Sequence, residues 1–132
     1  MIDHLSIGVS DFARSLAFYD IVLAELGFKR CMAMNLATKK VAAYGPSDRP
    51  IFWIGRQDQL TTAITPSAGF HIAFQATTRT AVDTFYAAAI AAGATDNGKP
   101  GLRPQYHPNY YAAFVLDPDG YNIEAVCHQP QH

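Results

Sequence analysis

Two histidines and one glutamate are the residues of this sequence whose types and spacing could do chemistry. His4 and His71 lie 67 residues apart, each in a short apolar stretch near the start of one half of the chain. Glu124 lies in the apolar stretch 121–127. A carboxylate in a half-buried strand needs a metal, a salt-bridge partner or a solvated face to offset its desolvation.

Two neutral imidazoles and one carboxylate form a ligand set that suits divalent Fe, Mn, Ni, Co or Zn. Three protein ligands leave coordination positions open for water or substrate, which is the condition for catalysis. The alternative for either histidine alone is a hydrogen-bonded residue at the core or rim of a strand. The equivalent positions of His4 and His71 in the two halves favour a metal site to which both halves contribute.

The segment 98–111 is the candidate substrate lid. Its imidazole, His107, could serve as a general acid or base, and Arg103 could bind a substrate carboxylate through two hydrogen bonds. Tyr110 is a further candidate for substrate binding. Tyr111 is expected to donate a hydrogen bond to an oxygen at the metal.

Two aromatic residues, Trp53 and Phe114, are candidates for lining an apolar substrate pocket, although core packing would explain them equally well. A tight turn at 117–120 predicts that Ala113 lies opposite Glu124. In that register Tyr111 would lie on the same face of the sheet as Glu124.

A duplicated β-α-β-β-β module would position these residues. In the first copy, alternation predicts a strand over 2–9, and a stripe of apolar residues predicts a helix that is capped by Ser10 or Asp11 and ends at Gly27. Strands are expected near 28–34, 39–44 and 51–55. In the second copy we expect a strand over 69–76, a helix ending at Gly93 with Thr78 or Thr80 as its cap, a short strand near 94–96, an irregular loop over 98–108, and a hairpin of 110–116 with 121–127.

The composition describes one globular domain over residues 1–132, with module one at about 1–56, a linker at about 57–68 and module two at about 69–128. Of the 132 residues, 49% are hydrophobic and 16% charged, which is typical of a folded domain rather than a disordered one. The net charge of −1 provides no basic field for nucleic acid or an anionic membrane. No apolar run is long enough to span a bilayer. Cys31 and Cys127 are expected to be reduced thiols, and the start of the chain resembles no signal peptide, so we expect a cytoplasmic protein.

The paired modules, the strand histidines, the run from Ser10 to Tyr19 and the segment Asp117-Pro118-Asp119-Gly120-Tyr121-Asn122-Ile123-Glu124 resemble the vicinal oxygen chelate superfamily. That superfamily includes glyoxalase I, extradiol dioxygenases, fosfomycin-resistance transferases and bleomycin-binding proteins. The resemblance implies an α+β, glyoxalase-like fold in which two βαβββ modules form curved mixed sheets around a metal cavity. It also implies that His4, His71 and Glu124 are the metal ligands. The modules would pair within one chain or be exchanged across a homodimer.

The implied function is a divalent-metal-dependent enzyme that acts on a small molecule chelated through adjacent oxygens. The alternative is a small-molecule binding or sequestering protein of the bleomycin-resistance type. The segment Ile51–Ile54 lacks the fourth ligand of glyoxalase I, a glutamate, which favours ring-cleavage or lyase/isomerase chemistry. Phe114 stands where extradiol dioxygenases and fosfomycin transferases have a tyrosine.

Overall fold

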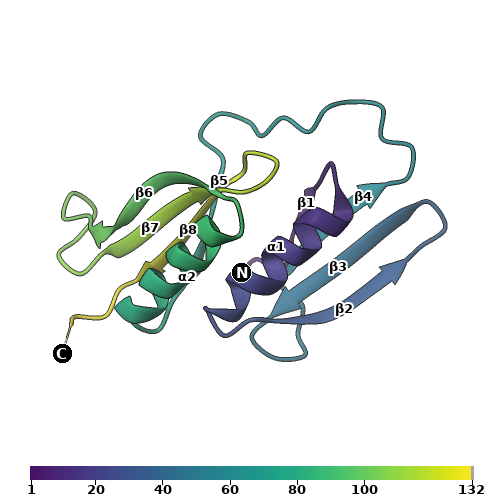
Figure 1. The fold of residues 1–132 in the computed structure, drawn as a ribbon. Helices are drawn as coiled ribbons and strands as arrows, with labels where there is room; N and C mark the ends of the chain where they lie inside the picture. Colours follow the sequence, from purple (N-terminus) through teal and green to yellow (C-terminus); the bar gives the residue numbers. More distant parts are fainter. Residues whose placement is uncertain (132) are drawn as a thin grey trace.

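The computed structural model describes residues 1–131 and contains the two β-α-β-β-β modules that the sequence predicts (Figure 1). Module one contains β1 (Leu5–Gly8), α1 (Phe12–Ala24), β2 (Lys29–Asn35), β3 (Lys39–Gly45) and β4 (Phe52–Gln57). Module two contains β5 (His71–Gln75), α2 (Arg79–Ala91), β6 (Thr95–Leu102), β7 (Tyr111–Leu116) and β8 (Asn122–Cys127). None of the helices in this part of the chain has the length and apolar character needed to cross a lipid bilayer.

Each module forms one four-stranded mixed sheet, and the two sheets have the same topology. The strand orders are β1-β4-β3-β2 and β5-β8-β7-β6. In each sheet the first strand of the module lies parallel to the last, and the other neighbours are antiparallel. The predicted α+β fold of two modules is therefore confirmed. The two histidines occupy equivalent places in it, because His4 directly precedes β1 and His71 begins β5.

The helices begin where short polar side chains cap them. Asp11 accepts a hydrogen bond from the backbone N–H of Arg14, and Thr78 accepts one from the backbone N–H of Ala81. Ser10, the alternative cap of α1, binds Asp119 of module two instead. Each helix therefore starts at one of the two residues that the sequence offered as its cap.

The two modules share one hydrophobic core. Each helix covers one face of its own sheet, and α1 contacts α2 where the modules meet (Figure 1). Phe52 of β4 and Phe74 of β5 pack edge to face across this boundary, with ring centroids 5.3 Å apart. The opposite face of each sheet carries no helix formed by residues 1–131. Because strand side chains alternate, Trp53 and Glu124 lie on these open faces.

The turn between β7 and β8, which we call the clasp turn (117–121), ties module two to module one. The Tyr19 hydroxyl on α1 donates a hydrogen bond to Asp117 Oδ2. The backbone N–H of Ser10 donates to Asp119 Oδ2 at 3.1 Å, and the Tyr121 hydroxyl donates to the carbonyl of Gly8 at 2.8 Å. The clasp turn therefore fixes the strand that carries Glu124 relative to the N-terminal strand.

We expect Tyr19→Phe to destabilise the fold by about 1–3 kcal/mol, because it leaves an oxygen of the buried Asp117 carboxylate without its donor. Urea unfolding at neutral pH measures the change. Tyr121→Phe is the matched control, since it removes a hydroxyl that bonds at the surface. Equal stability of Tyr19→Phe and the unsubstituted protein would contradict the assigned role of this bond.

The buried tyrosines predict a loss of stability in alkali. Burial, followed by the charge of Asp117, raises the pKa of Tyr19 well above its usual value, and burial, followed by Asp20, raises that of Tyr44. Above about pH 10 the unfolded chain releases these protons while the folded protein keeps them, so the free energy of unfolding falls as pH rises. Urea midpoints measured between neutral pH and about pH 11 should show this decline, and Tyr44→Phe should make it shallower. A flat profile would contradict the prediction.

The predicted loop 98–108 is wrong in its first half. Residues 95–102 form β6, although they include Gly98, Pro100 and Gly101. Proline has no backbone N–H to donate to a neighbouring strand. Pro100 is tolerated because β6 is an edge strand, which pairs with a neighbour on one side only. The pairing with β7 shifts on either side of Gly98, and such bulges are typical of edge strands.

Candidate metal and substrate site

Glu124 is a buried carboxylate on the open face of the module two sheet. It lies in β8 with a relative exposure of 1%. The Tyr110 hydroxyl donates a hydrogen bond to Glu124 Oε2, and His71 Nε2 lies 3.5 Å from Glu124 Oε1. Parallel pairing of β5 with β8 places Ala73 opposite Glu124 and so brings His71 onto the same face. Burial, followed by the hydrogen bond to Glu124, raises the pKa of Tyr110.

His4 occupies the open face of module one. Its side chain is 54% exposed, and its Nδ1 lies 2.6 Å from Asp3 Oδ1. A carboxylate at Nδ1 holds the imidazole in the tautomer whose Nε2 is free to bind a metal. The hydrogen bond with His4 also lowers the pKa of Asp3. Sequence reasoning missed this role of Asp3, although a carboxylate next to a candidate histidine ligand was a visible signal.

The structure brings His71 and Glu124 together, but it places His4 on the other sheet. Within residues 1–131, no three His, Cys, Asp or Glu side chains form a cluster that could hold a metal ion. One chain therefore presents two parts of the predicted ligand set on two separate open faces.

The predicted register of the β7–β8 hairpin is wrong by one residue. Phe114, not Ala113, lies opposite Glu124. Gly120 has φ +87° and adds a residue to the turn, so that Leu116 pairs with Asn122. Tyr111 consequently lies on the helix side of the sheet and not on the face of Glu124.

Tyr111 has structural contacts in its observed position. Its hydroxyl donates a hydrogen bond to Asp83 Oδ1 of α2 at 2.6 Å, and the Arg79 guanidinium lies 5.2 Å from its ring centroid. Burial, followed by the bond to Asp83, raises its pKa to about 12. The expectation that Tyr111 shares the face of Glu124 is therefore wrong, and the hydroxyl that reaches Glu124 is that of Tyr110.

Arg103 and Phe114 extend the site along the open face of module two. The Arg103 guanidinium lies 5.5 Å from the Phe114 ring centroid, and its Nη2 donates to the carbonyl of Lys99 at 2.7 Å. Phe114 of β7 lies directly opposite Glu124 of β8. The Arg103 guanidinium beside Phe114 therefore lies on the same face as the Glu124 carboxylate. The remaining N–H groups of Arg103 can bind an anion.

His107 forms a pair with His128. His107 Nε2 and His128 Nδ1 are 2.6 Å apart, and the backbone N–H of Asn109 donates to His107 Nδ1 at 3.1 Å. Both imidazoles pack against the Tyr110 ring, at centroid distances of 5.4 and 5.3 Å. Sequence reasoning did not single out His128, although the period of two from Glu124 indicated the same face.

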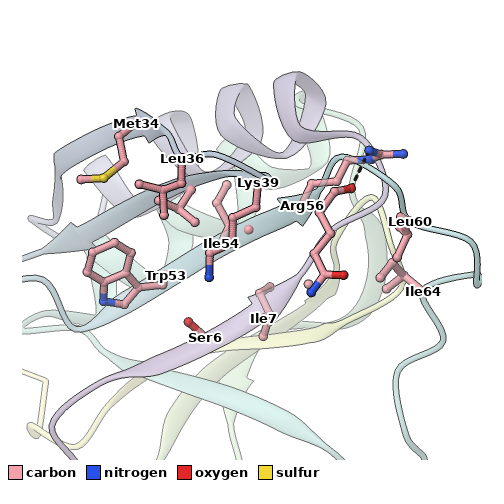
Figure 2. A pocket seen from close by; sticks show the side chains of 14 residues that line it. Ser6, Ile7, Met34, Leu36, Lys39, Trp53, Ile54, Arg56, Leu60 and Ile64 are labelled. Carbon is pink, nitrogen blue, oxygen red and sulfur yellow. Dashed lines mark hydrogen bonds between the residues drawn. The ribbon is translucent and has the colours of Figure 1, made fainter.

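Trp53 lies in a cavity of about 640 Å³ on the open face of module one, which Figure 2 shows. Its ring centroid is 6.4 Å from that of His4. Trp53 thus lines a cavity, and its contact with a substrate stays a prediction. The other pocket candidate, Phe114, lies on the second sheet.

Comparison with known proteins supports the family that the sequence resembles. The model of the Glyoxalase/Bleomycin resistance protein/Dioxygenase superfamily matches residues 1–125. A glyoxalase/bleomycin resistance protein from Albidiferax ferrireducens has a similar structure, with 28% identity and a TM-score of 0.75, over 95% of this chain and 97% of that one. No curated protein matches the chain.

Two more distant structures share the fold. A mutant of glyoxalase I from Zea mays is 21% identical with a TM-score of 0.76, and the match covers 95% of this chain but only 46% of that one. A mutant of a fosfomycin resistance protein from Listeria monocytogenes, solved with Mn(II) and a dihydroxypropylphosphonic acid, is 17% identical with a TM-score of 0.66. This match covers 96% of our chain and 88% of the Listeria chain. The sequence match over almost the whole chain and the shared two-module fold mean that this protein belongs to the Glyoxalase/Bleomycin resistance protein/Dioxygenase superfamily.

Proposed function

We propose that this protein is a divalent-metal-dependent enzyme of glyoxalase/dioxygenase type that acts on a small molecule through two adjacent oxygens. The observation that carries the proposal is the buried Glu124 carboxylate, which faces His71 across 3.5 Å on an open sheet face. A buried carboxylate beside one imidazole leaves negative charge that a divalent cation would neutralise. The metal could be Fe, Mn, Ni, Co or Zn.

We further propose that two copies of the chain assemble each site. His71 and Glu124 of one copy would form it together with His4 of the second copy. The open faces of both sheets are free to meet those of a second copy, because the helices cover only the opposite faces. A two-fold homodimer would then contain two equivalent sites.

The residues around the ligands have separate proposed roles. The ion, when bound, would supply a Lewis acid for charge that develops on the substrate oxygens. Tyr110 would hold Glu124 in place, while Arg103 and Phe114 would orient the substrate by charge and by ring contact. The pair of His107 and His128 would exchange a proton with the bound substrate beside Tyr110.

The second candidate function is a binding or sequestering protein without catalysis. The large apolar cavity beside Trp53 favours it, because that cavity lies within one chain and needs no metal. Both candidates fit a cytoplasmic location, which we propose because Cys31 and Cys127 are free thiols.

Metal content separates the two functions. Protein purified without chelator should hold about one divalent ion per chain, and metal removal should abolish turnover in a screen of catechols, hemithioacetals and oxyacids. Less than about 0.1 equivalent of metal, with no thermal stabilisation by added Fe, Mn, Ni, Co or Zn, would leave only the binding function.

A further inference from the structure

We propose that the cavity on module one binds an amphipathic organic anion, with a ring at Trp53 and an anionic group at Lys39. This names the chemical class of the ligand. Only the statement that this ligand is the substrate rests on the proposed function. The cavity is formed by one chain, so ligand binding does not require the metal site.

Paired glycines create the cavity. Gly8 of β1 and Gly55 of β4 are direct neighbours on the open face, so no side chain rises from the floor between Trp53 and the end of the strand. A Cβ on Gly55 would meet only Val41 at 3.4 Å and a backbone oxygen at 3.6 Å, which are ordinary contacts. The glycines therefore leave a hollow that a ligand can fill.

The walls of the cavity are apolar and rich in groups that contact rings. Figure 2 shows Trp53 and Met34 towards one end and Leu60 and Ile64 towards the other. An indole and a thioether are favourable contacts for an aromatic ring. The volume of about 640 Å³ lies in the usual range for small-molecule sites. An apolar body of ring size is therefore the best match to this surface.

Lys39 is the charge that remains for a ligand. Within residues 1–131, it forms none of the ion pairs with carboxylates. Arg56 also borders the cavity, but its guanidinium donates to the carbonyls of Ser10 and Gln57, and Figure 2 shows it turned outwards. In the part of the chain that the structure describes, no Asp or Glu lines the cavity to neutralise the ammonium group.

Strand register sets the length of the ligand. Lys39 lies opposite Gln57, four residues along β4 from Trp53. Four residues of a strand span about 13 Å, and the flexible lysine side chain shortens that distance. A ring and an anionic group separated by a few methylenes would therefore fit. The ring end lies next to His4, the candidate metal ligand, at 6.4 Å between ring centroids of His4 and Trp53.

The fluorescence of Trp53, the only tryptophan of the chain, reports binding directly. We would titrate chelated, metal-free protein with 5-phenylvalerate and with its neutral amide. We expect the fluorescence to change saturably with both probes. The carboxylate should bind about fivefold more tightly than the amide, which is the contribution of one solvent-exposed ion pair. Equal affinity for the amide, or no saturable change, would overturn the proposal.

Three variants assign the contributions. Lys39→Gln should remove the preference for the carboxylate. Lys40→Gln, the matched control on the helix side of β3, should keep it. Gly55→Val introduces a side chain that suits a strand and fills the hollow, so it should weaken the binding of both probes equally. Loss of the preference in Lys40→Gln, or unchanged binding in Gly55→Val, would contradict the assigned site.

Metal content of the same preparation before chelation keeps this proposal separate from the proposed function. Probe binding in protein that takes up no metal would support the cavity and overturn the enzyme. Metal uptake without probe binding would support the metal site and overturn the cavity.

Discussion

A mixture of His4→Ala and Glu124→Gln chains should regain metal binding that neither variant has alone. In a dimer whose sites combine module one of one copy with module two of the other, the mixed dimer has one intact site. That site takes His4 from the Glu124→Gln chain and takes His71 and Glu124 from the His4→Ala chain. If the chains exchange at random, half of the dimers are mixed, and about a quarter of all sites are restored.

A second mixture is the control for this complementation. His71→Ala and Glu124→Gln both damage module two, so each site of their mixed dimer lacks one ligand and no metal binding returns. Metal content after subunit exchange and gel filtration measures both mixtures. Unchanged metal binding by His4→Ala alone would remove His4 from the site. Failure of the first mixture, with a dimer present, would contradict sharing between copies.

The overall fold was predictable because duplication repeated each signal. Apolar stripes with Gly27 and Gly93 beyond their ends predicted both helices, and each copy supported the reading of the other. The strand histidines were predictable for the same reason. Pairing of the first and last strands of each module then explains why His71 reaches Glu124, which lies 53 residues further along the chain.

The hairpin register could not be read from the sequence because one backbone dihedral angle decides it. Asp117-Pro118-Asp119-Gly120 is compatible with a four-residue turn or with a turn that Gly120 lengthens by one residue. That choice moves every side chain of β7 to the other face relative to β8. It therefore exchanged Tyr111 for Phe114 beside Glu124.

The partner of Glu124 was equally hard to predict because a loop supplies it. Tyr110 directly precedes β7, and its hydroxyl reaches Glu124 only because the chain folds back from Arg103, whose N–H donates to the Tyr110 carbonyl. Loop conformations of this kind depend on tertiary contacts, such as the packing of Tyr106 on Tyr110 at 4.9 Å, and have no sequence period.

Glu124→Gln should leave the stability of the metal-free protein almost unchanged while it abolishes stabilisation by metal. The glutamine carbonyl can still accept the hydrogen bond from Tyr110, and the substitution removes a buried charge, so we expect a change within about 1 kcal/mol. With metal at about a hundredfold over its Kd, the unsubstituted protein should gain about 2.7 kcal/mol, and the variant should gain nothing. Urea unfolding with and without the metal measures both quantities.

Tyr110→Phe is the matched variant, because it removes the donor to Glu124 and keeps the carboxylate. Residues that orient a metal ligand typically contribute a factor of about 10 to 100 in metal affinity. We therefore expect Tyr110→Phe to require about 10 to 100 times more metal than the unsubstituted protein for the same shift in unfolding midpoint. At saturating metal the variant should reach the full shift. A metal-dependent shift in Glu124→Gln equal to that of the unsubstituted protein would show that the buried carboxylate has only a structural role.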